Sequence, residues 1–472
     1  MKATPSAGPP QTARPEAVRN LKPRPAAQGL PVPLKMVFSL VAMTLLGALL
    51  LRLPGVSYRR LTFGEALFTS ASAVTVTGLS VIDPAVDLTP LGKVVLSGLI
   101  QVGGIGALTL TVLVFRLLGR RINLLERIAL RNTLGRVDAR SVLSLAGWVI
   151  LGVFLIEGLG ALVLWLHWRP ALAPALGGEL QAFLFAAFHS MSAFCNAGFE
   201  LFSNLPGMGD NIPTDAASLA LLGGLITAGG VGVPVIADLL ALRKRQRLSL
   251  NTRLTLAIYF GLVLLGGLGM FFAEGLAGWP DPDLRWYEWL GLSIFQSISA
   301  RTGGLTGSLG FETLTPASQF LVVALMFVGA APASMGGGIT TGTAAVLGLA
   351  MWAYAGNRAD PAVGGRTVAR ASIQRATAVL ILSMLVVLVA TWLLLLTHPR
   401  VAVIDALFEV VSAFATCGLT LAFTGQLNQF GQVVIMLVMI WGRLGALTVV
   451  VALSRPAPQP LMRYPEENLL IG

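Results

Sequence analysis

Long apolar segments, separated by short polar stretches, fill most of the chain after residue 33. Eight of them are long enough, or nearly so, to cross about 30 Å of hydrocarbon as helices. They form four pairs: Met36–Leu51 with Val94–Phe115, Val142–Leu166 with Leu219–Leu242, Leu254–Phe272 with Phe320–Ala355, and Ala376–Thr397 with Val433–Leu453. Between the members of each pair lies an apolar run of only about a dozen residues, too short to span a bilayer. The pattern predicts a helix, a re-entrant pore helix with its loop, and a second helix, repeated four times.

Each short apolar run ends in the same motif, in which Phe is followed by spacer residues, Ser-Ala and a glycine. The copies are FTSASAVTVTGL (Phe68–Leu79), FHSMSAFCNAGF (Phe188–Phe199), FQSISARTGGL (Phe295–Leu305) and FEVVSAFATCGL (Phe408–Leu419). Non-helical backbone at membrane depth is tolerated only where it lines water or is buried in protein. We therefore expect the four loops to converge on one axis, where their carbonyl groups can surround an ion.

Composition agrees with a membrane environment. Hydrophobic residues make up 55% and charged residues 12% of the 472 residues, whereas soluble domains carry roughly 25% charged residues. The mean hydropathy is +0.78. We predict a multi-pass protein of the cell membrane.

The basic residues give the orientation. Most of the 33 Lys and Arg residues lie before the first helix, in the connections between units, or after the last helix. The positive-inside rule places that side, with both termini, in the cytoplasm. The net charge of +11 is thus mostly a topology signal, and no aromatic residues are interleaved with the basic ones as nucleic-acid binding would favour.

The same features divide the chain into segments. Residues 1–33 are rich in Pro, Ala and basic residues and lack an apolar signal-peptide core, which predicts a disordered cytoplasmic tail. The remaining divisions are pore unit 1 (34–116), a cytoplasmic linker (117–141), pore unit 2 (142–242), a linker with pore unit 3 (243–357), and a linker with pore unit 4 and the C-terminal tail (358–472).

Taken with three further motifs, the four loops resemble the Trk/Ktr/HKT superfamily of potassium transporters. These motifs are QVGGIG (Gln101–Gly106), SMGGGIT (Ser334–Thr340) and WGRLG (Trp441–Gly445). The first unit begins at the first hydrophobic segment and the chain ends in YPEENLLIG, so the eight-helix KtrB type is favoured over the ten-helix TrkH type. The resemblance implies an all-α polytopic membrane protein, with four pseudo-symmetric units around a central pore.

The resemblance also implies a potassium selectivity filter. It maps the filter glycines, and potassium binding, onto Gly78, Gly198, Gly304 and Gly418. Carbonyl rings can replace the water shell of potassium without a side-chain charge, and glycine accepts the backbone conformation that such loops need. In plant relatives a serine at the first of these positions goes with sodium preference, so glycine here favours potassium. The residues expected to face the ion are Val76, Thr77, Gly78, Asn196, Ala197, Gly198, Thr302, Gly303, Gly304, Thr416, Cys417 and Gly418.

Two points about the filter stay open at this stage. The third copy is one residue shorter between Ser-Ala and the glycine, so Gly303 is the alternative to Gly304. In addition, four glycines could serve only for close packing of helices.

A second glycine system lies in the second helix of each unit. Gly103, Gly104 and Gly106 match Gly229, Gly230 and Gly232, and the third unit expands the pattern into GAAPASMGGGITTGT (Gly329–Thr343). So many small and helix-breaking residues predict an irregular segment within this helix. By resemblance it is an intramembrane gating loop below the filter; the alternative is a kinked packing helix. The predicted gate residues are Ala333, Ser334, Met335, Gly336, Gly337, Gly338 and Arg443.

Arg443 occupies the matching place in the fourth unit. An arginine at mid-membrane costs roughly 2.5 to 3.5 kcal/mol on insertion scales, so it is not expected to face lipid. By resemblance we interpret it as an electrostatic barrier that interacts with the gating loop, and the alternative is a structural pair with an acid.

Other charged residues are less informative. Asp83, Asp87, Glu200 and Asp210 follow filter loops and either attract cations or are ordinary solvated residues. Glu157 lies inside an apolar segment and is expected to have a partner in the bundle.

The functional expectation is potassium uptake by the ion-translocating subunit of a Ktr-type system, with sodium as a candidate activator. The alternative is a sodium-conducting or poorly selective cation transporter of the same fold. An enzyme is not expected, since no paired carboxylates, Ser/His arrangement or GxxxxGK[ST] loop occurs. No cofactor is expected in this chain. The resemblance implies a homodimer that docks on a cytoplasmic nucleotide-binding ring subunit of RCK type (KtrA-like), with the basic segments Arg116–Arg140 and Arg243–Arg253 facing either that ring or membrane lipid.

Overall fold

The computed structural model describes most of the chain from residue 32 onward. The described residues are 32–106, 142–203, 205, 212–240, 242, 247–281, 284–307, 310–332, 334–358 and 360–445. The predicted tail up to residue 31, the linker 117–141, Asp210 and the C-terminal tail after residue 445 therefore lie outside the described residues.

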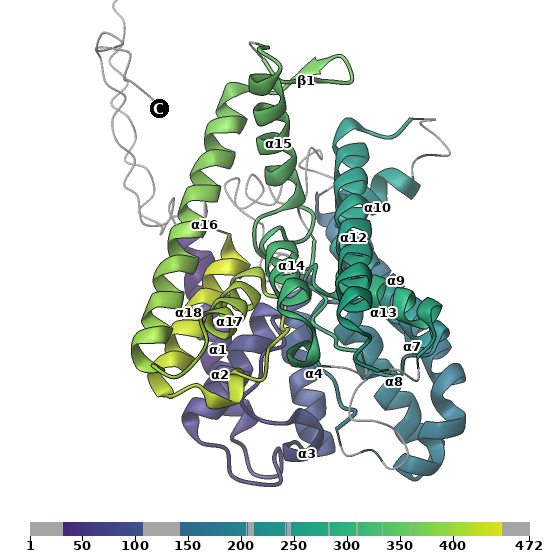
Figure 1. Cartoon of the computed structure of the whole chain (residues 1–472). Coiled ribbons are helices and arrows are strands. Elements are labelled where there is room, and N and C mark those ends of the chain that lie inside the picture. Colours follow the sequence, from purple (N-terminus) through teal and green to yellow (C-terminus); the bar gives the residue numbers. More distant parts are fainter. Residues whose placement is uncertain are drawn as a thin grey trace, which may run out of the picture.

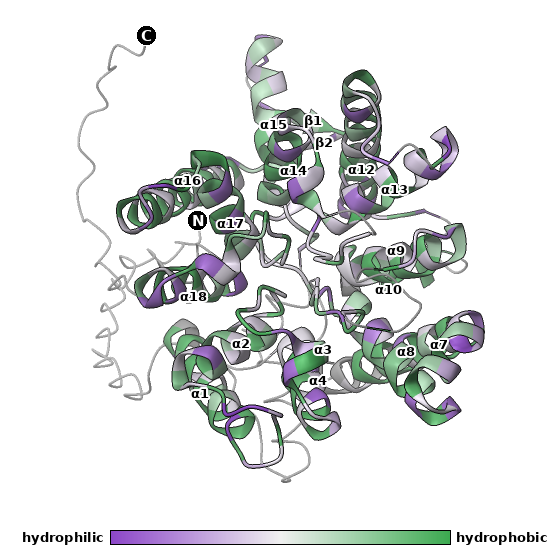
Figure 2. Cartoon of the chain, turned by 60° about the horizontal axis from the view of Figure 1, so that its bottom comes forward, coloured by the Kyte–Doolittle hydropathy of each residue, from purple (hydrophilic) through white to green (hydrophobic). Residues whose placement is uncertain are grey.

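Four units of the predicted kind surround a common centre, as Figure 2 shows. The first helices of the units are α1 (Val32–Leu51), α7 (Val142–Leu176), α12 (Leu250–Ala277) and α16 (Arg370–Thr397). The pore helices are α2 (Phe63–Thr75), α8 (Glu179–Phe194), α13 (Trp286–Ser299) and α17 (Val403–Ala415). Each pore helix packs against the first helix of its own unit.

The second helices are shorter or broken. They are α4 (Pro90–Ile105), α9 (Ala216–Gly230) with α10 (Val233–Leu240), α14 (Pro316–Phe327) with α15 (Thr341–Ala355), and α18 (Gln429–Leu444). The apolar segments Leu219–Leu242 and Phe320–Ala355 each contain two helices instead of one. The predicted interruption of unit three is present, and unit two is bent by 103° between α9 and α10.

A glycine with positive φ marks the end of the helix in the other units. The φ angles are 86° at Gly106, 85° at Gly232 and 78° at Gly445. This backbone region is incompatible with a right-handed helix and is open mainly to glycine. A glycine with left-handed backbone therefore follows α4, α9 and α18.

The four second helices start in the same way. Thr89, Asp215, Thr315 and Asn428 each accept a hydrogen bond from the backbone N–H three residues later. Such caps satisfy an N–H group that would otherwise lack a partner at the helix start. The repeated cap fixes where each chain re-enters the bundle after its filter loop.

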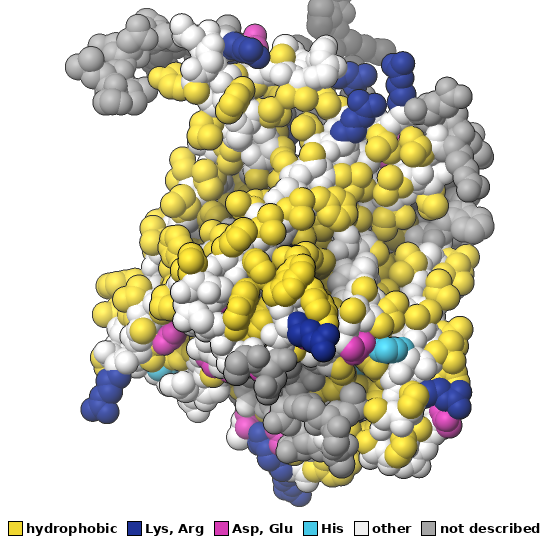
Figure 3. All heavy atoms as spheres, turned by 45° about the vertical axis from the view of Figure 1, so that its right-hand side comes forward, with side chains coloured by type: hydrophobic (Ala, Val, Ile, Leu, Met, Phe, Trp, Pro, Cys, Tyr) yellow, Lys and Arg dark blue, Asp and Glu magenta, His cyan; other side chains and the backbone are white. Residues whose placement is uncertain are grey.

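Among the described residues, four helices (α1, α7, α12 and α16) are long and apolar enough to cross a membrane, and the bent pair α9 and α10 would make a fifth. Figure 3 shows hydrophobic side chains in a broad band, with most charged side chains above and below it. The short elements are α3 (Pro84–Asp87), η1 (Phe311–Thr313), η2 (Thr424–Gln426) and the hairpin β1 (Ala362–Val363) with β2 (Arg366–Thr367).

Figure 1 places the hairpin, with the adjoining ends of α15 and α16, at the opposite end of the molecule from α3. Apart from that hairpin the described elements are helical. The predicted fold class, an all-α polytopic membrane protein built from four related units, is confirmed.

Candidate functional site

Four glycines form a closed ring at the centre of the bundle. A Cβ atom added to Gly78 would lie 3.0 Å from the Cα atom of Gly198, and one added to Gly198 would lie 2.9 Å from the Cα atom of Gly304. A Cβ atom on Gly418 would lie 3.1 Å from the Cα atom of Gly78, and one on Gly304 would overlap the Cys417 carbonyl oxygen. The loops therefore approach one another more closely than any side chain permits.

The backbone at this ring also requires glycine. The φ angles are 95° at Gly78, 69° at Gly198, 71° at Gly304 and 94° at Gly418. All four values lie in the left-handed region that favours glycine. The packing alternative requires that helices approach closely at these glycines. The close approach is instead between loops.

The residue two positions before each ring glycine is also left-handed. The φ angles are 57° at Val76 and Asn196, 75° at Thr302 and 49° at Thr416. This equivalence aligns Gly304 of the shorter third loop with the other ring glycines. Gly303 faces elsewhere, because a Cβ atom there would meet Ile226 and Ser299.

The serine of each Ser-Ala pair anchors its loop. The Oγ atoms of Ser72 and Ser412 each accept a hydrogen bond of 3.0 Å, from the N–H groups of Gly78 and Gly418 respectively. In the other two loops the serine donates instead, Ser192 to the Phe199 carbonyl (2.7 Å) and Ser299 to the Leu305 carbonyl (2.5 Å). This shared role explains why Ser-Ala recurs at the end of every pore helix.

The residues before three of the ring glycines, Thr77, Ala197 and Cys417, direct carbonyl oxygens toward the neighbouring loop. A Cβ atom on Gly78 would lie 2.5 Å from the Ala197 carbonyl oxygen, and one on Gly418 would overlap that of Thr77. The side chains of Thr77 and Cys417 are buried in the wall.

The wall also holds contacts between loops. The Asn196 amide lies 2.9 Å from Oγ1 of Thr302, which joins the second and third loops. The Sγ atom of Cys417 lies 3.4 Å from the Ser299 carbonyl, which joins the fourth and third.

A vestibule of about 390 Å³ lies directly above the ring and is lined by all four ring glycines. Asp83 and Glu200 border it, together with Thr420 and Thr424. The Oε2 atom of Glu200 is buried and has no hydrogen-bond partner among the described residues. Burial, with a further contribution from the charge of Asp83, raises the pKa of Glu200 to about 8.

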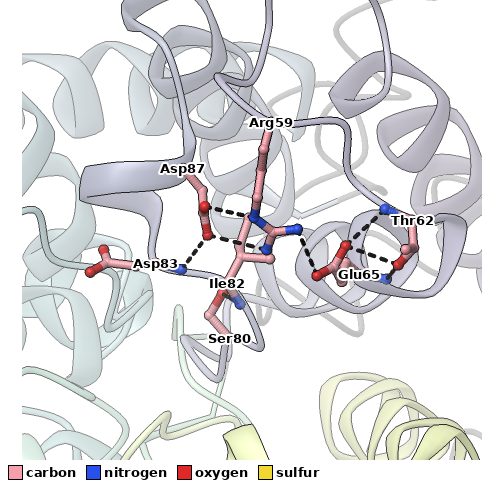
Figure 4. A network of polar contacts seen from close by, with 7 residues as sticks. All are labelled: Arg59, Thr62, Glu65, Ser80, Ile82, Asp83 and Asp87. Carbon is pink, nitrogen blue, oxygen red and sulfur yellow. Dashed lines mark hydrogen bonds and ion pairs between the residues drawn. The ribbon is translucent and has the colours of Figure 1, made fainter.

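Asp87 has a different role, which Figure 4 shows. Its carboxylate accepts a hydrogen bond of 2.8 Å from Nε of Arg59 and one of 3.0 Å from the N–H of Asp83. Arg59 also pairs with Glu65 at 2.9 Å. Of the predicted acidic residues, Asp83 and Glu200 therefore border the vestibule, whereas Asp87 is already paired with a cation.

The segment between α14 and α15 lies below the ring. A Cβ atom on Gly337 would lie 2.7 Å from Oγ1 of Thr416, and one on Gly336 would overlap Oγ1 of Thr302. The segment thus lies against Thr302 and Thr416, the left-handed residues of the third and fourth loops. Gly338 has a φ of 76°, and Ala333 lies outside the described residues.

Backbone hydrogen bonds join this segment, the gate loop (residues 329–340), to unit two. The N–H of Ala331 donates to the Gly230 carbonyl at 2.9 Å, and the N–H of Met335 donates to the Gly229 carbonyl at 3.2 Å. Those carbonyls belong to the last turn of α9, where the helix stops. The break in unit two therefore supplies acceptors for the gate loop of unit three.

Arg443 lies in the last turn of α18 and bridges two elements. Its Nη1 donates to the Met335 carbonyl of the gate loop, and its Nη2 donates to the Gly103 carbonyl at the end of α4. A longer contact of 3.4 Å reaches the Gly104 carbonyl. Carbonyl groups at a helix C-terminus favour a cation, and within the described part of the chain Arg443 has no ion pair with an acid.

Glu157 has the partners that the sequence left unnamed. Its carboxylate accepts hydrogen bonds from Nε2 of Gln101 (3.1 and 3.2 Å) and lies 3.3 Å from Sγ of Cys195. Ser190 donates to its carbonyl at 2.7 Å. This residue therefore joins α7, α4 and α8.

Three buried charged residues were missed by the sequence reasoning. Glu409 of α17 accepts hydrogen bonds from Thr420 (2.8 Å) and Thr424 (2.5 Å), and Glu274 of α12 accepts one from Oγ1 of Thr315 (2.8 Å). The third is Arg301, inside the third filter loop. A charge within an otherwise apolar run was the available signal in each case.

Comparisons with known proteins identify the family of this chain. The TrkH family, described as "Cation transport protein", matches residues 33–265 and 291–463. The chain is 34% identical to Ktr system potassium uptake protein B of Vibrio alginolyticus over 93% of this chain and 94% of that protein. It is 33% identical to Ktr system potassium uptake protein D of Bacillus subtilis (92% and 94%) and 31% identical to the potassium/sodium uptake protein NtpJ of Enterococcus hirae (87% and 90%).

A solved structure shows the same fold. The potassium transporter TrkH from Vibrio parahaemolyticus superposes with a TM-score of 0.68 at 18% identity, covering 89% of this chain and 84% of that one. The resemblance drawn from the loop motifs is thereby confirmed, and the chain belongs to the TrkH family of cation transport proteins.

Proposed function

We propose that this chain is the ion-translocating subunit of a potassium uptake system of Ktr type. The observation that carries the proposal is the closed ring of Gly78, Gly198, Gly304 and Gly418, each with a positive φ and beside carbonyl groups of a neighbouring loop. Its relatives named above are potassium uptake proteins, which supports the same substrate.

The ring suits a dehydrated monovalent cation. Backbone carbonyls replace the water ligands of potassium, and an uncharged ring releases the ion again because no carboxylate lies within it. Asp83 attracts cations into the vestibule above, and Glu200 adds to this attraction once its carboxyl is charged. The membrane potential then supplies about 2.3 kcal/mol per charge for each 100 mV.

The gate loop would control passage from below. In the structure it lies against Thr302 and Thr416, and Arg443 holds the Met335 carbonyl. We infer that ions pass only when this contact is released and residues 334–338 move aside. The positive charge of Arg443 beneath the filter adds an electrostatic barrier to cations.

The proposal includes partners. This chain would act as a homodimer on a cytoplasmic nucleotide-binding ring of RCK type, with both termini on that side of the membrane. The name of the relatives, "Ktr system", supports a system of several components. Nucleotide would bind to the ring alone, and sodium would act as an activator.

Uptake in cells that lack their own potassium transporters tests the proposal. The chain, expressed with and without a cognate ring subunit, should restore growth at low potassium and accumulate the tracer rubidium. A protein that reaches the membrane but supports neither would overturn it.

The second candidate is a poorly selective cation transporter, which the similarity to the potassium/sodium uptake protein NtpJ favours. It would carry sodium at a comparable rate in the same cells. Competition of sodium against rubidium uptake separates the two candidates.

A further inference from the structure

A second buried arginine lies within the filter itself. Arg301 precedes Thr302 in the third filter loop, and its side chain has no exposed surface. In the other three copies every residue between Ser-Ala and the ring glycine is uncharged. A charge at this depth is costly, so it requires specific partners and points to a function.

The surroundings of Arg301 contain a π face and a carbonyl but no carboxylate partner in the described part of the chain. Its Cζ atom lies 4.7 Å from the ring centroid of Tyr259 on α12, and Tyr259 is itself fully buried. Its Nη2 donates a hydrogen bond of 2.7 Å to the carbonyl of Gly329. Nε and Nη1 have no hydrogen-bond partner among the described residues.

Gly329 lies at the base of the gate loop, where the first and last residues of the loop are adjacent. The helix α14 ends at Phe327, and Val328 forms a bridge with Ile339 on the returning leg. A Cβ atom on Gly329 would overlap the Gly337 carbonyl oxygen. The carbonyl that Arg301 holds is thus next to the point from which the loop would move.

The two buried arginines therefore hold the gate loop at different places. Arg443 comes from unit four and binds the Met335 carbonyl, near the middle of the loop. Arg301 comes from the filter loop of the same unit and binds the base. Release of the first contact frees the loop, whereas the second continues to tie it to the filter.

We propose that Arg301 is a positioning residue that fixes the base of the gate loop to the third filter loop, so that gate movement and filter geometry are coupled through one side chain. The inference rests on the proposed function. Arg301 connects the two sites directly. Its backbone adjoins Thr302, a filter residue with a φ of 75°, and its guanidinium donates a hydrogen bond to the Gly329 carbonyl. Removing the guanidinium leaves the buried Gly329 carbonyl without this hydrogen bond. The strained third filter loop then loses its connection to the gate loop.

The test compares Arg301→Gln and Arg443→Gln in full-length protein reconstituted into liposomes, with rubidium and sodium fluxes measured separately. Arg443→Gln should raise both fluxes together and keep their ratio. Arg301→Gln should lower the rubidium-to-sodium ratio by about tenfold, within the range typical of coupled sites. Arg301→Lys, which keeps the charge and a donor, should restore part of the ratio.

A purely structural role would change the amount of folded protein without changing the ratio. Gel-filtration profile and thermal unfolding are therefore measured beside the fluxes. If Arg301→Gln does not fold, Arg301→Lys and Tyr259→Leu, which removes the π face, replace it and should lower the ratio to smaller degrees. A wild-type ratio in every folded variant would overturn the inference, while absence of rubidium flux in the wild type would instead overturn the proposed function.

Discussion

The filter loops and the segments directly below them differ in how closely they follow the fourfold repeat. In the filter, each unit supplies a left-handed residue, a ring glycine and an anchoring serine, and only the third loop is shorter. Below it, units one, two and four end or bend their second helix at a glycine, whereas unit three inserts the gate loop. The filter loops therefore keep the fourfold repeat, whereas the segments below them depart from it in unit three.

The difference has a physical reason. Under the proposed function, an ion held by carbonyl groups needs similar ligands on all sides, so the filter loops are under the same constraint in each unit. A gate needs only one element that moves and neighbours that hold it. The end of α9 supplies the Gly229 and Gly230 carbonyls, α18 supplies Arg443, and α4 supplies the Gly103 carbonyl that binds the same arginine.

The largest effect is expected from breaking the filter. Gly198→Ala places a Cβ atom 2.9 Å from the Cα atom of Gly304 at a φ of 69°, so the ring must open. Rubidium uptake should fall by at least about a hundredfold, since steric overlap and backbone strain together cost several kcal/mol. The control is Gly98→Ala in α4, where a Cβ atom would meet nothing within 4 Å. Normal uptake by a well-folded Gly198→Ala protein would refute the ring as the ion path.

The second largest effect is expected from the contact between Arg443 and the gate loop. Arg443→Gln removes a charged donor from the Met335 and Gly103 carbonyls. Such hydrogen bonds contribute about 1.5 to 3 kcal/mol, so the open state should gain about tenfold or more in population. Initial rates of rubidium uptake at saturating substrate measure the gain. Arg400→Gln, which changes an exposed arginine between α16 and α17, should leave the rate unchanged. A similar increase there would show that the charge acts without the gate loop.

A smaller effect is expected above the ring. The pKa of Glu200 is about 8, raised by burial and by Asp83, so its carboxyl is mostly neutral at pH 7 and mostly charged at pH 9. The added negative charge should lower the half-saturating rubidium concentration by about two- to threefold as pH rises. Glu200→Gln should abolish that dependence, and Glu179→Gln, an exposed acid, should retain it. A pH dependence that persists in Glu200→Gln would assign it to another group.

The sequence predicted the repeat well because each unit repeats the same chemical demands. The motif located the pore helices, and the ring glycines were placed from the pattern together with the family resemblance. The register of the third loop was open between Gly303 and Gly304, because spacing alone does not show which residue adopts the left-handed conformation that aligns Thr302 with Val76.

Contacts between distant segments were beyond reach of the sequence. The hydrogen bond from Gln101 to Glu157 and the one from Arg301 to Gly329 join residues from different elements. Helix breaks at Gly106 and Gly445 were also missed as terminations, since a single glycine within an apolar run is equally compatible with a continuous helix.

The smallest effect should come from the caps, which follow the repeat but lie in neither the filter nor the gate. Asn428→Ala removes the acceptor for the Gly431 N–H (2.7 Å) at the start of α18. The loss should lower the free energy of unfolding by about 1 kcal/mol, which is measured by thermal unfolding in detergent. Asn428→Asp keeps the acceptor and should unfold like the wild type. Because the cap lies at the opposite end of α18 from Arg443, the rubidium-to-sodium ratio should not change, and a change would mean that the start of this helix also sets the filter.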